Sequence, residues 1–167
     1  MSSAFVRIST LIVIFSLGAA PVAAGREGSG QPLPRFVSLR AGEVNMRIGP
    51  GEQYPIDWVY QRAGMPMEVV AEYYTWRRVR DWRGTEGWIH TSMLSGRRAM
   101  VVSGEVRALR TEPDPRSPVV ARVEPGVFGR LRQCPESGGW CLVEIAGFKG
   151  WLRRGDFWGA YTSERVK

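Results

Sequence analysis

Residues 44–55 read Val44-Asn45-Met46-Arg47-Ile48-Gly49-Pro50-Gly51-Glu52-Gln53-Tyr54-Pro55. Apolar and polar residues alternate as far as Ile48, which indicates a short β-strand with one buried face. The Gly49-Pro50-Gly51 sequence predicts a tight turn, in which glycine supplies positive φ angles and proline fixes its own φ. The stretch brings no catalytic group, so we expect it to build a fold and to serve binding.

The first 24 residues differ in composition from the rest of the chain. Arg7 is the only charged residue before Arg26, and an almost unbroken apolar run covers residues 8–18. Small residues at 22–24 suit a signal peptidase, so we predict a secretory signal peptide at residues 1–24. The alternative is a retained membrane anchor, but the run is well short of the ~20 residues that a spanning helix needs. We therefore expect a periplasmic or secreted protein with no stable membrane span after signal cleavage.

Beyond a linker at residues 25–35, the chain contains two similar halves. Trp76 and the pair Gly87-Trp88 in the first half correspond to Trp140 and the pair Gly150-Trp151 in the second, at shifts of 64 and 63 residues. Short alternating segments are separated by glycine and proline, and no helical period is present outside the signal peptide. We predict an all-β fold of two small barrels with about five strands each, at residues 36–96 and 97–160, followed by a C-terminal tail at 161–167.

These motifs resemble bacterial SH3-like (SH3b) domains over roughly residues 37–158. The first copy carries the fuller match, in Val44-Asn45-Met46-Arg47, Gly49-Pro50-Gly51, Tyr54-Pro55, Trp76-Arg77-Arg78-Val79 and Gly87-Trp88-Ile89-His90. The second copy departs from it, because Thr111-Glu112-Pro113-Asp114-Pro115 replaces the Gly-Pro-Gly turn. The resemblance implies tandem SH3-like barrels and a groove lined by Tyr54, Trp76 and Trp88 in the first copy. The weaker candidates in the second copy are Trp140, Trp151 and Phe157.

A second set of candidate ligand-binding residues follows from strand alternation. Trp76, Arg78, Arg80 and Trp82 occupy every second position, so we expect them to share an outer face while Val79 faces the core. Two interpretations remain open for this face. It is either a self-stabilising exterior or a recognition surface for sugar rings or acidic groups, since arginine and tryptophan attract each other and such ligands.

The only two cysteines, Cys134 and Cys141, flank a turn-like Pro-Glu-Ser-Gly-Gly sequence. A hairpin there brings the two thiols together, and an oxidising compartment favours a disulfide between them. The alternative is a metal or redox pair. Two cysteines and the single His90 cannot complete a tetrahedral metal site, and the spacing differs from the CxxC redox motif. We expect no metal and no cofactor.

The formal net charge is +7, but its arginines are spread over both halves. In an exported protein we expect these side chains to solvate the surface or to meet envelope anions, and we expect no nucleic-acid partner. His90 is the only histidine, and carboxylates such as Asp81 and Glu86 are dispersed among arginines, whose positive charge argues against a general-acid role. We therefore predict that the protein is not an enzyme.

Three functions fit these features. The first is a cell-envelope binding module that recognises peptidoglycan or its peptide stems. The second is a periplasmic adaptor or assembly factor that binds another envelope protein through a groove or a strand edge. The third is a protein held by charge on anionic lipid, which the absence of a dense basic cluster disfavours.

Overall fold

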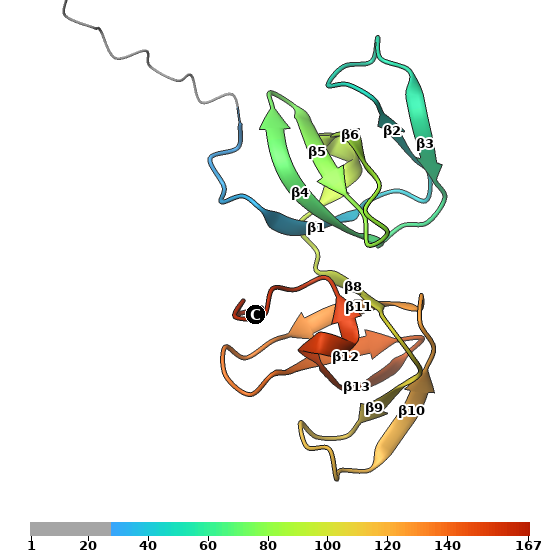
Figure 1. Cartoon of the computed structure of the whole chain (residues 1–167), viewed down its shortest axis with the longest axis vertical. Coiled ribbons are helices and arrows are strands. Elements are labelled where there is room, and N and C mark those ends of the chain that lie inside the picture. Colours follow the sequence, from blue (N-terminus) through green and yellow to red (C-terminus); the bar gives the residue numbers. More distant parts are fainter. Residues whose placement is uncertain (1–27) are drawn as a thin grey trace, which may run out of the picture.

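The computed structural model describes residues 28–167, and the predicted signal peptide at 1–24 lies outside the described residues. Two consecutive antiparallel sheets account for the described part, one above the other in Figure 1. The predicted all-β fold with two tandem barrels is confirmed. Among residues 28–167, no helix is long and apolar enough to cross a membrane.

The first barrel, residues 35–95, has the strand order β3-β2-β6-β5-β4-β1-β7. Its elements are β1 (Arg35–Leu39), β2 (Val44–Arg47), β3 (Ile56–Tyr60), β4 (Pro66–Tyr73), β5 (Trp76–Arg80), β6 (Glu86–His90), the 3-10 turn η1 (Thr91–Met93) and β7 (Leu94–Ser95). Buried and exposed positions alternate along β5, where Val79 is buried between the exposed Arg78 and Arg80. The predicted inward position of Val79 is therefore confirmed.

The second barrel, residues 99–158, repeats this topology in the order β10-β9-β13-β12-β11-β8-β14. Its elements are β8 (Ala99–Val102), β9 (Arg107–Arg110), β10 (Val119–Val123), β11 (Phe128–Gln133), β12 (Trp140–Ile145), β13 (Phe148–Arg153), the 3-10 turn η2 (Arg154–Asp156) and β14 (Phe157–Trp158). Each sheet has seven strands where about five were predicted. Strands such as β7 and β14 have only two residues, which is too short for an alternating pattern.

One glycine in each barrel allows two strands to cross closely. A Cβ atom on Gly87 would lie 3.0 Å from the carbonyl oxygen of Arg47, and one on Gly150 would lie 2.7 Å from that of Arg110. Neither glycine has a positive φ, so it is the missing side chain that matters here. The repeated Gly-Trp step therefore marks the place where β6 meets β2, and where β13 meets β9.

Each barrel encloses its own apolar core. Met46, Met67, Val69, Val79 and Ile89 are fully buried in the first. The core of the second contains Met100, Leu109, Val143 and Leu152, together with both cysteines. Cys134 and Cys141 form the predicted disulfide, with 4.3 Å between their Cα atoms. Because the cores are separate, the relative placement of the barrels depends on contacts between their surfaces.

One such contact lies beside β1. The ring of Phe36 packs edge-on against Trp158, with 4.8 Å between centroids, and against the tilted ring of Tyr161 at 4.7 Å. The Tyr161 hydroxyl donates a hydrogen bond of 2.8 Å to Oε1 of Glu68. Glu68 is only 5% exposed, and its second oxygen accepts 2.6 Å and 3.0 Å hydrogen bonds from Arg80.

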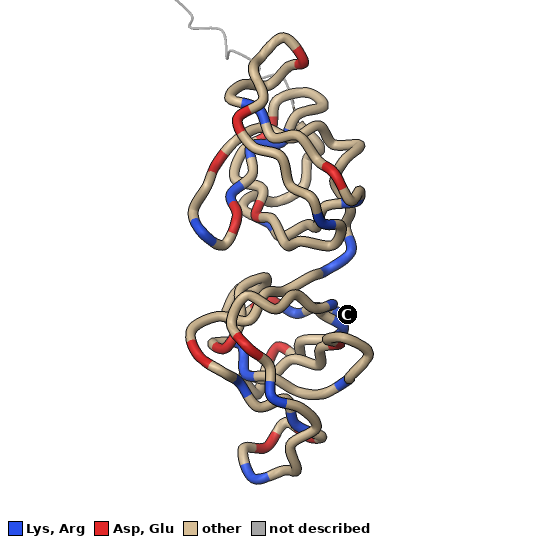
Figure 2. Tube along the Cα trace, turned by 90° about the vertical axis from the view of Figure 1, so that its right-hand side faces the viewer, with Lys and Arg blue, Asp and Glu red and all other residues tan. Residues whose placement is uncertain are grey.

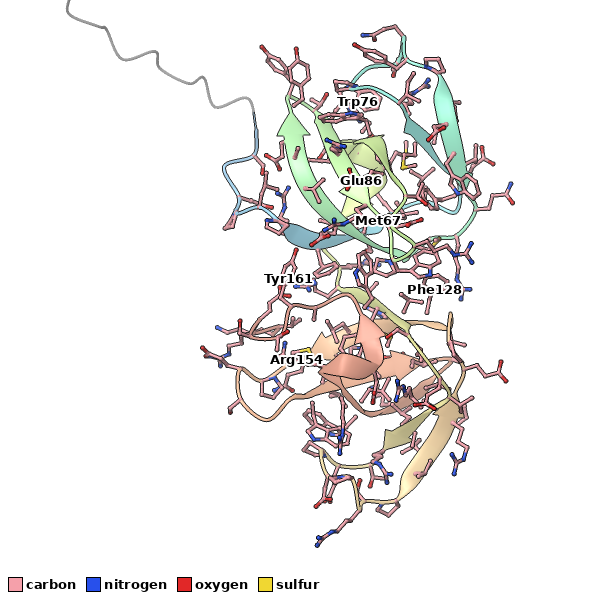
Figure 3. The ribbon with its side chains drawn as sticks, in the orientation of Figure 1. Met67, Trp76, Glu86, Phe128, Arg154 and Tyr161 are labelled. Atoms are coloured by element: carbon pink, nitrogen blue, oxygen red, sulfur yellow. A yellow bond between two sulfur atoms is a disulfide. The ribbon has the colours of Figure 1, made fainter. Side chains whose placement is uncertain are left out.

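A second contact closes the opposite side of the junction. Trp82 meets Phe128 of the second barrel edge-on at 5.0 Å, and the guanidinium of Arg62 lies over the same Phe128 ring at 4.7 Å. Figure 3 shows Tyr161 and Phe128 on opposite sides of the space between the barrels. Aromatic contacts at both sides hold the two barrels as a pair.

The C-terminal residues 161–167 pack on both the junction and the second barrel. Both terminal nitrogens of Arg98 bind the two carboxylate oxygens of Glu164, and one also donates 2.8 Å to the carbonyl of Gly159. Burial opposes ionisation of Glu164, but the hydrogen bonds and charge of Arg98 outweigh it and lower the pKa of this carboxyl. Val166 pairs with Cys134 through backbone hydrogen bonds of 2.9 Å and 3.0 Å. The disulfide hairpin therefore serves as a docking edge for the chain end.

Candidate functional site

The outer face of β5 and β6 carries four of the six candidate ligand-binding residues. Trp76, Arg78 and Arg80 lie on the outer side of β5, and Trp88 lies on β6 directly opposite Arg78. Trp76 pairs with His90 in the next row, with their rings edge-on at 5.3 Å. The strand alternation thus brings these four candidates onto one surface of the first barrel. Trp76 lies at the end of this surface that is remote from the second barrel (Figure 3).

The arginines of this face are already paired with carboxylates. Arg78 lies 2.8 Å from Glu86, and Arg80 lies 2.6 Å from Glu68 and 3.9 Å from Glu86. The hydrogen bonds that Arg80 donates to Glu68 raise the pKa of Arg80, since they favour its charged form. A face with two arginines and two glutamates has little net charge, so its capacity for binding lies mainly in its aromatic rings.

Trp82 does not continue this face, contrary to the alternation-based expectation. Strand β5 ends at Arg80, and Asp81 begins a turn in which its Oδ1 accepts 2.9 Å hydrogen bonds from the backbone of Arg83 and Thr85. The turn redirects Trp82 onto Phe128 of the second barrel. Alternation fails there because it holds only while the strand continues.

Tyr54 lies on the other side of Trp88. Arg47, which pairs with Trp88 across β2 and β6, donates a 2.7 Å hydrogen bond to the carbonyl of Tyr54 and so holds the loop. The Tyr54 ring packs on Gly49 so closely that a Cβ atom there would lie 2.5 Å from it. Gly49 and Gly51 do not have positive φ angles, so the expectation for this turn is wrong. Gly49 is needed to seat the aromatic ring.

His90 has a local structural partner. Its Nδ1 lies 2.7 Å from the Ser92 hydroxyl. Nδ1 also accepts a 3.3 Å hydrogen bond from the Ser92 backbone nitrogen, so the His90 side chain caps the N-terminus of η1. Within residues 28–167, no group of three or more His, Cys, Asp or Glu side chains is arranged to hold a metal ion. Tyr60 donates a 3.1 Å hydrogen bond to Asp81, and burial together with that carboxylate raises the pKa of Tyr60.

The sequence interpretation missed Trp58, a large apolar side chain on the same barrel. Trp58 is 52% exposed on β3, and Ile56 beside it is also exposed. Trp58 pairs with the buried Met46, but β3 is the edge strand of its sheet and four of its five residues are exposed, so exposure does not alternate along it. Tyr73 and Tyr74 form another exposed aromatic pair, edge-on at 4.8 Å.

The second barrel keeps the backbone arrangement of this site but lacks two of its exposed aromatic side chains. Arg110 donates a 2.6 Å hydrogen bond to the carbonyl of Ser117, seven residues ahead, as Arg47 does to Tyr54. Ser117 therefore occupies the place of Tyr54, and Ala121, which pairs with Leu109, occupies that of Trp58.

Of the weaker candidates in the second barrel, Trp140 and Trp151 are half-buried on the outer side, with Arg153 over the Trp140 ring. Phe157 is only 5% exposed and belongs to the core, so its expected place in a groove is wrong. It begins β14, which pairs with β8 and closes the barrel. The exposed aromatic surface is therefore concentrated on the first barrel.

Comparison with solved structures gives only low similarity scores. Among solved structures, the chain is similar to NlpC1 from Trichomonas vaginalis (TM-score 0.36, 12% identity, 80% of this chain and 49% of that chain). It is also similar to NlpC2 from the same organism (TM-score 0.36, 11% identity, 77% of this chain and 49% of that chain). The chain thus spans about half the length of these structures.

No curated protein matches the sequence. The family model described as bacterial SH3 domain matches twice, at residues 40–96 and 103–159. These two matches cover the strands of both barrels except the first strand of each, β1 and β8, which lie just before the matched residues. The chain therefore belongs to the bacterial SH3 domain family and carries two tandem copies of the domain.

Proposed function

We propose that this protein is a non-catalytic cell-envelope binding module that recognises peptidoglycan or its peptide stems through the first barrel. The observation that carries the proposal is the one-sided distribution of exposed aromatic side chains. Tyr54, Trp58, Tyr73 and Tyr74 are exposed on the first barrel, which also carries the half-buried Trp76 and Trp88; these six side chains together are called the aromatic face below. The positions equivalent to Tyr54 and Trp58 in the second barrel hold Ser117 and Ala121.

The chemistry of this surface suits a ligand with sugar rings or a peptide backbone. Flat aromatic rings offer a large apolar area at low entropic cost, and Trp and Tyr also present a hydrogen-bonding group. Because Arg78 and Arg80 are paired with Glu86 and Glu68, charge contributes little to the attraction. Binding through this face should therefore change little with salt concentration, which separates it from adsorption on anionic lipid.

Sedimentation of the mature protein with purified sacculi tests the proposal. We expect binding that persists at high salt and that weakens about tenfold in Trp58→Ala, because loss of an aromatic anchor costs ~1–2 kcal/mol. The matched control is Phe148→Ala, since Phe148 on the second barrel is also 52% exposed. Failure of the wild-type protein to sediment, or equal loss in both variants, would contradict the proposal.

A second candidate function is supported by the edge strand of the first barrel. Strand β3 lies at one end of the sheet order, and four of its five residues are exposed. Such an edge can accept a strand from a partner protein, as an adaptor would require. A photo-crosslinker at Val59 on β3 should then capture a protein in the envelope, whereas one at Phe148 should not. Labelling of sacculi alone would favour the peptidoglycan proposal.

A further inference from the structure

A second surface, separate from the aromatic face, lies between the barrels. A hollow of about 650 Å³ is lined by residues from β1, the segment joining the barrels and β11. Its lining contains Arg40, Arg97, Arg98 and Arg130, and no acidic residue of the described chain lines it. Figure 2 shows basic positions along the segment that joins the barrels. The junction thus gathers positive charge from sequence positions up to 90 residues apart.

The four arginines fall into two classes. Arg40 donates hydrogen bonds of 3.1 Å and 2.9 Å to the carbonyl of Leu94, and Arg98 is tied to Glu164 and Gly159. Their guanidinium groups are therefore held in place before any ligand arrives. Arg97 and Arg130 are exposed, and within residues 28–167 neither has an ion-pair partner. Glu164 compensates Arg98, which leaves three arginines without a carboxylate.

The charge at Arg130 differs from that at the equivalent place in the first barrel. Arg130 pairs across the sheet with Glu144, and Glu144 pairs with Lys149, which gives a row of basic, acidic and basic residues. The corresponding row in the first barrel is Glu68, Arg80 and Glu86, with the signs reversed. Glu144 is engaged by Arg132, whose hydrogen bond lowers the pKa of this carboxyl. Arg130 therefore lines the hollow without an ion pair of its own among residues 28–167.

We propose that this hollow is a binding site for a phosphate group, borne by an envelope ligand large enough to fill the remaining volume. Arginine forks bind phosphate oxygens through paired, charge-assisted hydrogen bonds. A phosphate carries up to two negative charges, so it neutralises three unpaired arginines better than a single carboxylate does. The site is distinct from the aromatic face and does not depend on the function proposed above.

Titration calorimetry with inorganic pyrophosphate at low ionic strength tests this site on the mature chain. The test variant is the double substitution Arg97→Gln and Arg130→Gln. The control is the double substitution Arg116→Gln and Arg122→Gln, which removes the same two charges from exposed positions around the loop between β9 and β10. We expect the test variant to bind at least about tenfold more weakly, since each charge-assisted hydrogen bond is worth more than the 1.4 kcal/mol that corresponds to tenfold.

Three results would overturn the proposal: no heat of binding in the wild type, equal weakening in both double variants, or equal affinity for malonate, a dicarboxylate of similar charge. Circular dichroism establishes that each variant is folded. Arg97→Gln alone provides a milder second variant, for which we expect an intermediate affinity. Sacculus binding should be unchanged in the test variant. The phosphate-site proposal and the peptidoglycan proposal, which is tested by sedimentation of Trp58→Ala, can therefore fail independently.

Discussion

Tyr161 donates a hydrogen bond of 2.8 Å to Glu68, which joins the C-terminal segment to the first barrel across 93 residues of sequence. Glu68 is a buried carboxylate, and such a group must be surrounded by donors to stay charged. Arg80 supplies the other hydrogen bonds. This cluster, with Phe36 packed against Trp158 and Tyr161, fixes one side of the junction between the barrels.

Removal of the Tyr161 hydroxyl should loosen the junction. We expect Tyr161→Phe to lower the free energy of unfolding by about 1 kcal/mol. The substitution keeps the aromatic ring but leaves Oε1 of Glu68 without the hydroxyl that donates to it. Urea denaturation measures the change. Tyr73→Phe, which alters an exposed tyrosine, should stay within about 0.5 kcal/mol of the wild type. Equal effects in the two variants would show that the hydrogen bond does not contribute.

The ion pair between Arg98 and Glu164 predicts a pH dependence. The folded-state pKa of Glu164 is lowered from 4.5, so the pair contributes stability above that pH and loses it as the pH falls through the lower folded-state pKa. The stability difference between wild type and Glu164→Gln should thus be largest near neutral pH and shrink in acid. Denaturation curves recorded from neutral to acid pH measure it. A difference that grows in acid would refute this role.

Much of the fold was predictable because its signals are local. The Gly-Trp step and the alternation around Val79 each depend on a few neighbouring residues, and both recur in the second half. The contact of Glu68 with Tyr161 has no such signal, since it joins distant segments through side chains. Trp58 was missed because it lies on an edge strand along which exposure does not alternate, and Trp82 was misplaced because its strand ends two residues earlier.

The close crossing of β2 and β6 predicts that alanine substitution lowers stability much more at Gly87 than at Gly96. Gly87→Ala should destabilise the protein by ~1–3 kcal/mol, because the new Cβ would collide with Met46 and with the Arg47 carbonyl. Gly96→Ala is the matched control, because a Cβ atom at Gly96 meets nothing within 4 Å and its φ is not positive. Thermal unfolding compares them. A tolerated Gly87→Ala would mean that the strands can separate at little cost.

The disulfide should contribute to stability through its small closed loop. Reduction, or substitution of both Cys134 and Cys141 by alanine, should lower the free energy of unfolding by ~2–3 kcal/mol. Chemical denaturation with and without reductant measures this, and thiol titration of the untreated protein should find no free cysteine. Detection of two reactive thiols in the untreated protein would contradict the oxidised pair in the structure.

The central claim is that the first barrel binds peptidoglycan through its exposed aromatic face. Sacculus sedimentation of the wild type, Trp58→Ala and Phe148→Ala in parallel, at low and at high salt, tests it most directly. The account predicts that wild type and Phe148→Ala sediment at both salt concentrations, whereas Trp58→Ala remains mostly in solution. Sedimentation that disappears at high salt in all three proteins, or that is unaffected by Trp58→Ala, would contradict it.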